Sequence, residues 1–212
     1  MQDALFRPDR QVGAHRENRF HLKPDRFPGR HAAWGATSLA GTCCEGNVTP
    51  AAEYNIWVDP EAARIVLRSG LPTELVGWHL SRGEAVLNAN DIDKILRPDT
   101  PLARFAIDCN RTAKDAYFKQ TGETGISLPD PVAMAVALDP MICVDASDHY
   151  VDVEVTSDLT RMTVVDRLGI AGNRGNSAIW SEVPQKGKPA RICWVIDIGR
   201  RKGTLSRALE SQ

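Results

Sequence analysis

The sequence predicts an α/β fold in which helices are layered against a sheet. Helix and strand patterns alternate between residues 59 and 140, a strand-rich section follows, and an apolar run near the C-terminus has the pattern of a buried strand. The 212 residues, of which 42% are hydrophobic and 25% charged, are enough for one sizeable core. We therefore expect one domain over residues 42–212, preceded by an atypical segment over residues 1–41.

The first predicted element of this domain is a helix over residues 59–69. Asp59 can accept hydrogen bonds from the first free amides, Pro60 needs no donor at the first helical position, and Glu61 suits the positive end of the helix dipole. Gly70 then ends the helix. The same reasoning gives the next elements: a strand over 73–80, helices over 84–96 and 101–119, a loop over 122–128, and a helix that begins near residue 130.

After residue 140 the pattern changes from helices to strands. Three short apolar-rich runs follow, at 141–144, 150–155 and 162–165, and apolar and polar residues alternate clearly over 150–155. This period of two predicts strands that are exposed on one face, as in an antiparallel pair at the edge of a sheet. Residues 172–176 are typical of a turn-rich loop, 192–198 of a buried strand, and 200–209 of a basic helix.

Composition and charge exclude several classes of partner. The net charge is -1, so there is no global field to attract nucleic acid or an anionic membrane. The chain has neither an apolar run long enough to cross a membrane nor a secretion signal. Five cysteines, an odd number without metal-binding spacing, are typical of reduced thiols in the cytoplasm. Residues 1–41 carry seven Lys or Arg without apolar periodicity, so we expect a solvated tail rather than a nucleic-acid-binding arm.

A loop just before the first helix carries the polar side chains with the clearest chemistry. Asn47, Glu53 and Asn55 together offer hydrogen-bond donors and acceptors, the mixture that vicinal sugar hydroxyls require. In the alternative interpretation, residues 46–47 form a turn, and Glu53 and Asn55 are solvated loop residues. From spacing alone the alternative is the stronger of the two.

Two further residues have both a structural and a functional interpretation. Asp130, followed by Pro131, has the composition of a capped helix start, and it is also a carboxylate that can bind a metal ion. Tyr117 lies at core spacing on its helix, which favours packing in the core, and its functional interpretation comes only from the resemblance given below. His79 and His149 have no local partner that suggests a catalytic triad or a zinc site, so we interpret them as structural.

The segment GNVTPAAEYNIWVDPEAA at 46–63 resembles the sugar-binding loop of the inosine-uridine preferring nucleoside hydrolases. The segment LPDPVAMAVALDP at 128–140 is similar to the family segment that carries a calcium-binding aspartate, and the resemblance covers about residues 42–209. It implies hydrolysis of the N-glycosidic bond of ribonucleosides to ribose and a free base, with bound calcium. It also implies a Rossmann-like layered fold with a mixed sheet. In the family pattern Asn47, Glu53 and Asn55 would hold the ribose, Asp130 would bind calcium, and Tyr117 would line the base pocket.

The sequence departs from this family at its N-terminus. The aspartate-rich loop that supplies most metal carboxylates and the catalytic base has no counterpart, and Pro129 stands where many members have a histidine. One matched carboxylate is far from the six to eight oxygen ligands that calcium takes. The residues that perform catalysis are therefore unknown, and we expect the isolated chain to be a very poor or inactive catalyst. A truncated or frame-shifted coding sequence is our hypothesis for this departure.

The missing first strands should leave the sheet incomplete on its N-terminal side. An incomplete sheet exposes apolar faces and an unpaired edge, which predicts self-association as a homo-oligomer or a need for the missing segment. The rival interpretation is a catalytically inactive ribose-binding or partner-binding module derived from a nucleoside hydrolase. Purine or pyrimidine preference does not follow from the sequence.

Overall fold

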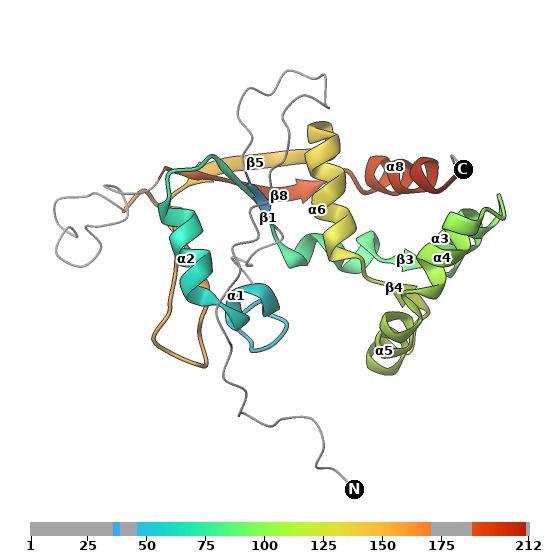
Figure 1. Ribbon diagram of the computed structural model, residues 1–212, viewed down its shortest axis with the longest axis horizontal. Coiled ribbons are helices and arrows are strands. Elements are labelled where there is room, and N and C mark those ends of the chain that lie inside the picture. The colour runs from blue at the N-terminus through green and yellow to red at the C-terminus, as the bar shows by residue number, and fades with distance from the viewer. Residues whose placement is uncertain (1–35, 39–45, 171–187, 211–212) are drawn as a thin grey trace, which may run out of the picture. The chain divides into compact units, whose positions relative to one another are not determined.

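A computed structural model describes residues 36–38, 46–170 and 188–210 (Figure 1). The chain divides into two units, Met1–Ala32 and Ala33–Gln212, and every described residue belongs to the second. The loop that we predict at 172–176, as well as Cys43 and Cys44, lies outside the described residues. None of the helices in the described ranges is long and apolar enough to span a membrane.

The main sheet has four strands in the order β1-β2-β8-β5. The first three strands are parallel, and β5 runs antiparallel to β8, so the prediction of a mixed sheet is confirmed. The strands are β1 (Ala36–Ser38), β2 (Thr73–Val76), β8 (Ala190–Ile196) and β5 (Cys143–His149). Within the described residues β1 pairs only with β2.

Two short antiparallel pairs accompany the main sheet. Strand β3 (Leu87–Asn88) pairs with β4 (Gly125–Ile126), and β6 (Val151–Val153) pairs with β7 (Thr163–Val165). The two alternating runs at 150–155 and 162–165 do form the predicted antiparallel pair. They make a separate ribbon, however, and β5 is the antiparallel strand of the main sheet.

The helices follow the predicted order with two exceptions. The α-helices are α1 (Tyr54–Val58), α2 (Pro60–Arg68), α3 (Ala89–Leu96), α4 (Pro101–Asp108), α5 (Arg111–Thr121), α6 (Pro129–Leu138) and α8 (Ile198–Glu210). Short 3-10 turns are η2 (Trp78–Ser81), η3 (Gly83–Ala85) and η4 (Pro140–Ile142). The predicted start of α2 is confirmed, because Asp59 Oδ1 accepts a hydrogen bond of 2.9 Å from Ala62 N–H.

The predicted helix over 84–96 is wrong in its first half. Residues before 89 form η3 and β3, and the helix starts only after Asn88. The side chain of Asn88 accepts from Asp91 N–H, and the side chain of Asp91 accepts from Asn88 N–H, which is a complete capping box. The predicted helix over 101–119 is interrupted at Asn110, whose side-chain amide donates 2.9 Å to Ala106 O. A side-chain hydrogen bond to the backbone therefore lies at both boundaries, a capping box at Asn88 and a bond from Asn110 back to the end of α4.

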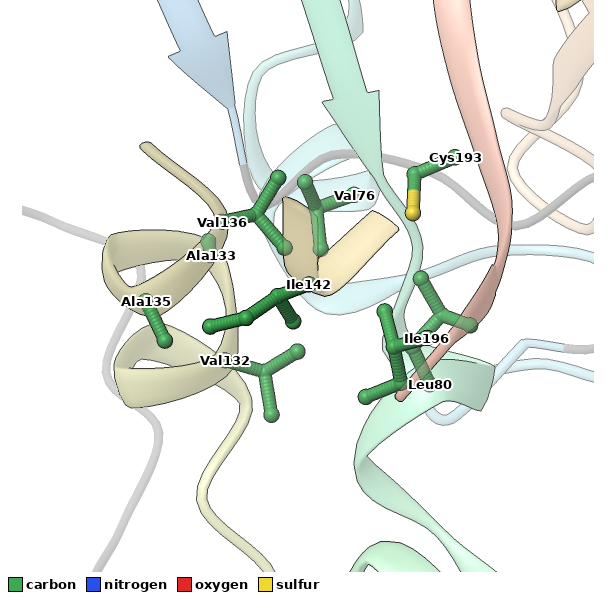
Figure 2. Packing of buried hydrophobic residues seen from close by; sticks show 9 residues of the cluster. All are labelled: Val76, Leu80, Val132, Ala133, Ala135, Val136, Ile142, Cys193 and Ile196. Carbon is green, nitrogen blue, oxygen red and sulfur yellow. The ribbon is translucent and has the colours of Figure 1, made fainter. Parts of the chain in front are cut away.

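The main sheet lies between two layers. Val76 and Cys193 belong to one core cluster with Val132 and Val136 of α6 (Figure 2). The next residues toward the N-terminus, Leu75 and Ile192, belong to another cluster, together with Leu67 of α2 and Val165 of β7. Because successive strand residues point to opposite faces, α6 covers one face and α2 with the β6-β7 ribbon covers the other. The predicted α/β layered fold is thereby confirmed.

Candidate functional site

The loop that precedes α1 is a closed turn that requires glycine at its start. Gly46 N–H donates to Pro50 O, and Asn47 N–H donates to Ala52 O, each at 3.0 Å. A Cβ atom on Gly46 would lie 2.1 Å from Thr49 O, which is far inside any allowed contact. The backbone therefore approaches itself here as only glycine permits.

Asn47 and Glu53 each use one oxygen to hold this loop. Asn47 Oδ1 accepts 2.8 Å from Tyr54 N–H, while Glu53 Oε2 accepts from Asn55 N–H at 3.0 Å and from Ile56 N–H at 3.4 Å. Within the described part of the chain Asn47 Nδ2 donates no hydrogen bond and Glu53 Oε1 accepts none. Glu53 caps α1 and is only 3% exposed, so the interpretation of Glu53 as a solvated loop residue is wrong. The loop keeps one donor and one acceptor that its own fold does not use.

Asn55 lies in the first turn of α1 and is exposed. It lines a cavity of about 250 Å³ under α2, which it shares with Leu67, Leu75 and Thr163 but not with Asn47 or Glu53. The hydroxyl of Thr163 lines the same cavity and is buried without a hydrogen-bond partner in the described structure. The structure thus does not gather the three predicted ribose residues in one cavity.

The segment after β6 anchors the loop, which we did not predict from the sequence. Thr49 Oγ1 donates 2.8 Å to Leu159 O, and Trp57 Nε1 donates 3.0 Å to Asp158 O. Arg161 Nη1 donates a hydrogen bond of 3.0 Å to Trp57 O, and the Arg161 guanidinium lies over the Trp57 ring. Arg161 has φ of 30°, a conformation that side chains avoid unless their surroundings hold them there. Arg161 is therefore a residue that positions the loop before α1.

Glu154 organises that anchoring segment. Its carboxylate accepts hydrogen bonds from the Thr156 hydroxyl and N–H, from Ser157 N–H and from the Thr160 hydroxyl. These hydrogen bonds lower the pKa of Glu154 to about 2, and the bond from the Thr156 side chain has the largest effect. The carboxylate therefore stays ionised and holds residues 154–160 in place at any physiological pH.

Asp130 does not cap α6. The cap position is Leu128, which makes no side-chain hydrogen bond, and Asp130 lies exposed in the first turn. The helix-cap interpretation is therefore wrong, although a carboxylate still suits this end of the helix dipole. In the ranges that the structure describes, no group of three or more His, Cys, Asp or Glu is placed to hold a metal ion. Since calcium takes six to eight oxygen ligands, these residues alone do not fit it.

Tyr117 packs where the structural interpretation places it. It is half-buried on α5, and a Cβ atom on Gly125 would lie 2.8 Å from its ring. The ring therefore lies directly on strand β4. Whether it also contacts a base, and whether Asn47, Glu53, Asn55 and Asp130 have their expected roles, stays a prediction.

His149 is held by hydrogen-bonding partners at both of its ring nitrogens. Its Nε2 lies 2.8 Å from Ser147 Oγ, and its Nδ1 lies 3.0 Å from Asp166 O. Trp194 Nε1 donates 2.7 Å to the same Ser147 Oγ. Two residues apart on a strand, Ser147 and His149 share one face, a spacing that could have revealed the pair. The network joins β5, β8 and the end of β7.

Solved structures with the same fold are nucleoside hydrolases. The plant nucleoside hydrolase PpNRh1 matches with a TM-score of 0.70 and 23% identity, over 82% of this chain and 52% of the plant chain. The purine-preferring ribonucleoside hydrolase from Gardnerella vaginalis matches with a TM-score of 0.63 and 22% identity, over 82% of this chain and 52% of its own. At such identities the likeness establishes the fold, which is that of the nucleoside hydrolases.

Sequence comparison establishes the family. The model of the family described as inosine-uridine preferring nucleoside hydrolase matches residues 32–200. The pyrimidine-specific ribonucleoside hydrolase RihA of Shewanella sp. (strain ANA-3) is 35% identical over 155 residues, which are 70% of this chain and 47% of the relative. RihA of Salmonella typhi is 34% identical over 155 residues, 70% of this chain and 48% of the relative. The chain belongs to the inosine-uridine preferring nucleoside hydrolase family.

The family match extends further toward the N-terminus than the domain that we predict from residue 42. The chain spans about half the length of the curated relatives it matches. The family match begins at residue 32, and strand β1 lies at 36–38, within the segment to which we assigned no regular structure. The domain boundary at residue 42 stays a prediction.

Proposed function

We propose that this chain supplies the ribose-binding side of an N-glycosidase that hydrolyses ribonucleosides to ribose and free base. Family membership supports the class of reaction. The main support for the site is that Asn47 and Glu53 each hold the loop with one oxygen and keep a second polar atom for a ligand. An amide donor and a carboxylate acceptor match neighbouring ribose hydroxyls, and Asn55 would contact the same sugar.

The rigidity of this loop supports a role in catalysis as well as in binding. Because Glu53 already caps α1 and is buried, its carboxylate needs no rearrangement to accept a hydrogen bond from a sugar hydroxyl. Hydrogen bonds to sugar hydroxyls strengthen as positive charge develops at the anomeric carbon. Such bonds stabilise the transition state more than the bound substrate, which is what accelerates a reaction.

The metal part of the proposal is limited to one ligand. We propose Asp130 as a calcium ligand whose companion ligands lie outside the described residues, since these hold no cluster that fits the ion. Tyr117 remains our candidate for base contact, although its packing on Gly125 favours a structural role.

A rival function follows from the lack of a complete metal site among the described residues. A chain that holds ribose without a complete metal site would be an inactive ribose-binding or partner-binding module. We propose a cytosolic location for either function, which the unpaired thiols of Cys109, Cys143 and Cys193 support.

The test measures reducing-sugar release from inosine and uridine with added calcium, and ribose binding by titration calorimetry. Glu53→Gln removes the charged acceptor, and Glu61→Gln, an equal change in the exposed first turn of α2, is the matched control. Turnover that Glu53→Gln abolishes and Glu61→Gln preserves would support the hydrolase. Ribose binding without turnover would favour the rival. Ribose binding that is equal in both variants would refute the loop as the sugar site.

A further inference from the structure

Ser147, His149 and Trp194 form a hydrogen-bonded network on the main sheet. Ser147 and His149 lie two residues apart on β5, so their side chains are on the same face of the sheet. The register between β5 and β8 shifts at Trp194, which has no pairing partner on β5 in the described structure (Figure 1). Such bulges turn a side chain in a new direction and are frequent next to active sites. Here the bulge is at the residue whose indole bonds to Ser147.

The chemistry of the partners fixes the direction of each hydrogen bond. Asp166 O is a backbone carbonyl and can only accept, so His149 Nδ1 carries the hydrogen in the bond of 3.0 Å between them. In a neutral imidazole the other ring nitrogen, Nε2, is then an acceptor. The hydroxyl of Ser147, which lies 2.8 Å from Nε2, therefore donates its proton to His149. A serine hydroxyl thus points at a base that is ready to take its proton.

The oxygen of Ser147 also accepts a hydrogen bond. Trp194 Nε1 lies 2.7 Å from Ser147 Oγ, and an indole N–H can only donate. This bond strengthens as the oxygen becomes negative, because hydrogen bonds to ionised acceptors are about twice as strong as neutral ones. The guanidinium carbon of Arg167 lies 4.7 Å from the centre of the same indole ring. Loss of the Ser147 proton is therefore assisted by a base, by a hydrogen-bond donor and by a nearby positive charge.

These groups have the arrangement of an activated nucleophile. In such sites a hydroxyl lies within hydrogen-bond distance of a base, and a third group orients the base. The third group can be neutral, as the asparagine of papain-like cysteine proteases is, because one of its tasks is to hold the imidazole in the correct tautomer. Asp166 O performs this task for His149. Ser147 is also exposed, so a small molecule can reach its oxygen.

We propose that Ser147 is a nucleophile that reacts with small activated carboxylic esters. Ser147 Oγ attacks the carbonyl carbon of the ester, and its proton passes to His149 Nε2. The bond from that carbon to the alkoxide breaks, and the alkoxide takes the proton from His149 and leaves as an alcohol. Water then hydrolyses the acyl-serine to a carboxylic acid and the free serine. None of the residues that we propose for ribose or calcium binding takes part.

The first experiment treats the full chain with a fluorophosphonate probe, from which fluoride leaves in place of the alkoxide while the serine stays phosphonylated. We expect one label per chain, located at Ser147 by peptide mass spectrometry, and none in Ser147→Ala. Ser69→Ala is the matched control and should be labelled at the unaltered rate, because Ser69 is exposed as well but bonds only to backbone groups. An unlabelled chain, or equal labelling of Ser69 and Ser147, would overturn the proposal.

Variants of His149 and Trp194 distinguish an activated serine from one that only joins strands. His149→Ala should slow labelling about 100-fold or more, the usual contribution of a general base, and added imidazole should restore part of the rate. Trp194→Phe keeps an aromatic ring but loses the N–H, so it should slow labelling about tenfold. Labelling of His149→Ala at the unaltered rate, or a loss that imidazole does not reduce, would make the network a purely structural one.

The class of substrate has its own test. With p-nitrophenyl acetate the unaltered chain should release a rapid burst of about one equivalent of p-nitrophenol per chain, followed by slower turnover, because the acyl-serine accumulates. Ser147→Ala should lack the burst, and Ser69→Ala should keep it. A chain without the burst, or a burst that Ser147→Ala retains, would refute the reaction with esters.

Discussion

Replacing Glu53 should separate its role in the fold from its role in binding. Glu53→Ala removes the cap of α1 and leaves two backbone N–H groups, those of Asn55 and Ile56, without their acceptor. Loss of a cap costs about 1 kcal/mol and an unsatisfied buried N–H at least about 1 kcal/mol more. We therefore expect Glu53→Ala to lower the free energy of unfolding by about 2 kcal/mol.

Glu53→Gln should behave differently, because glutamine keeps an oxygen that can accept both hydrogen bonds. A hydrogen bond to a charged group is worth about 1 kcal/mol more than a neutral one, so the loss in stability should be near that value. Ribose binding should fall about tenfold or more, since the acceptor charge that faces the sugar is gone. The free energy of unfolding comes from urea titrations followed by tryptophan fluorescence, and ribose affinity from calorimetry.

Two outcomes would refute this reasoning. If Glu53→Ala and Glu53→Gln destabilised the chain equally, the carboxylate oxygen would not be acting as the cap. If Glu53→Gln bound ribose as the unaltered chain does, the second oxygen would not face the sugar. Glu61→Gln, in the exposed first turn of α2, should change stability by about 0.5 kcal/mol and ribose affinity not at all.

The remaining predictions concern a buried ion pair, a glycine and the metal. Asp152→Asn should cost about 3 kcal/mol, because two arginines of α2 lose a carboxylate that is only 8% exposed. Burial raises the pKa of Asp152, but the arginine hydrogen bonds outweigh burial and hold it below 3.8. Its contribution is therefore present above pH 3.8 and lost as pH falls through the folded pKa, an acid destabilisation that the Asn variant should lack in urea titrations at several pH values. Gly46→Ala should cost about 2 kcal/mol through two lost turn hydrogen bonds, whereas Gly199→Ala, with its nearest contact at 3.5 Å, should be neutral by the same titration. Calcium titrated into the chain alone should bind no tighter than about 1 mM and equally to Asp130→Asn, since one carboxylate does not hold the ion; stoichiometric binding by calorimetry would contradict this.

The elements that could be predicted from sequence are those specified by neighbouring residues. The start of α2 at Asp59-Pro60 and the buried strand β8 each depend on local chemistry or a local apolar run. The helix breaks at Asn88 and Asn110 depend on single side chains that bond to backbone groups three or four residues away. Such residues compete with helix propensity, and periodicity alone does not show which effect prevails.

In the candidate site, too, local features could be predicted from the sequence and long-range contacts could not. The candidate ribose residues of the loop before α1 were predicted from their motif, and the buried cap of Glu53 is a local feature. The anchoring bonds were not found, because Thr49 bonds a residue 110 positions away and Trp57 one 101 positions away. No window of sequence contains both partners. The left-handed conformation of Arg161 is likewise set by tertiary contacts, not by its neighbours in the chain.

The loop before α1 and Asp130 therefore differ in what holds them in place. The loop before α1, which we propose as the ribose site, is held from within the described domain, by its own turn, by Glu53 and by the segment after β6. Asp130 has no such support, since it lies exposed in the first turn of α6 without companion carboxylates in the described residues. Ribose affinity should consequently depend on residues that the structure describes, whereas calcium affinity should depend on ligands outside them. In our proposal hydrolysis requires both, so a variant of Glu53 and the loss of those ligands should each abolish it.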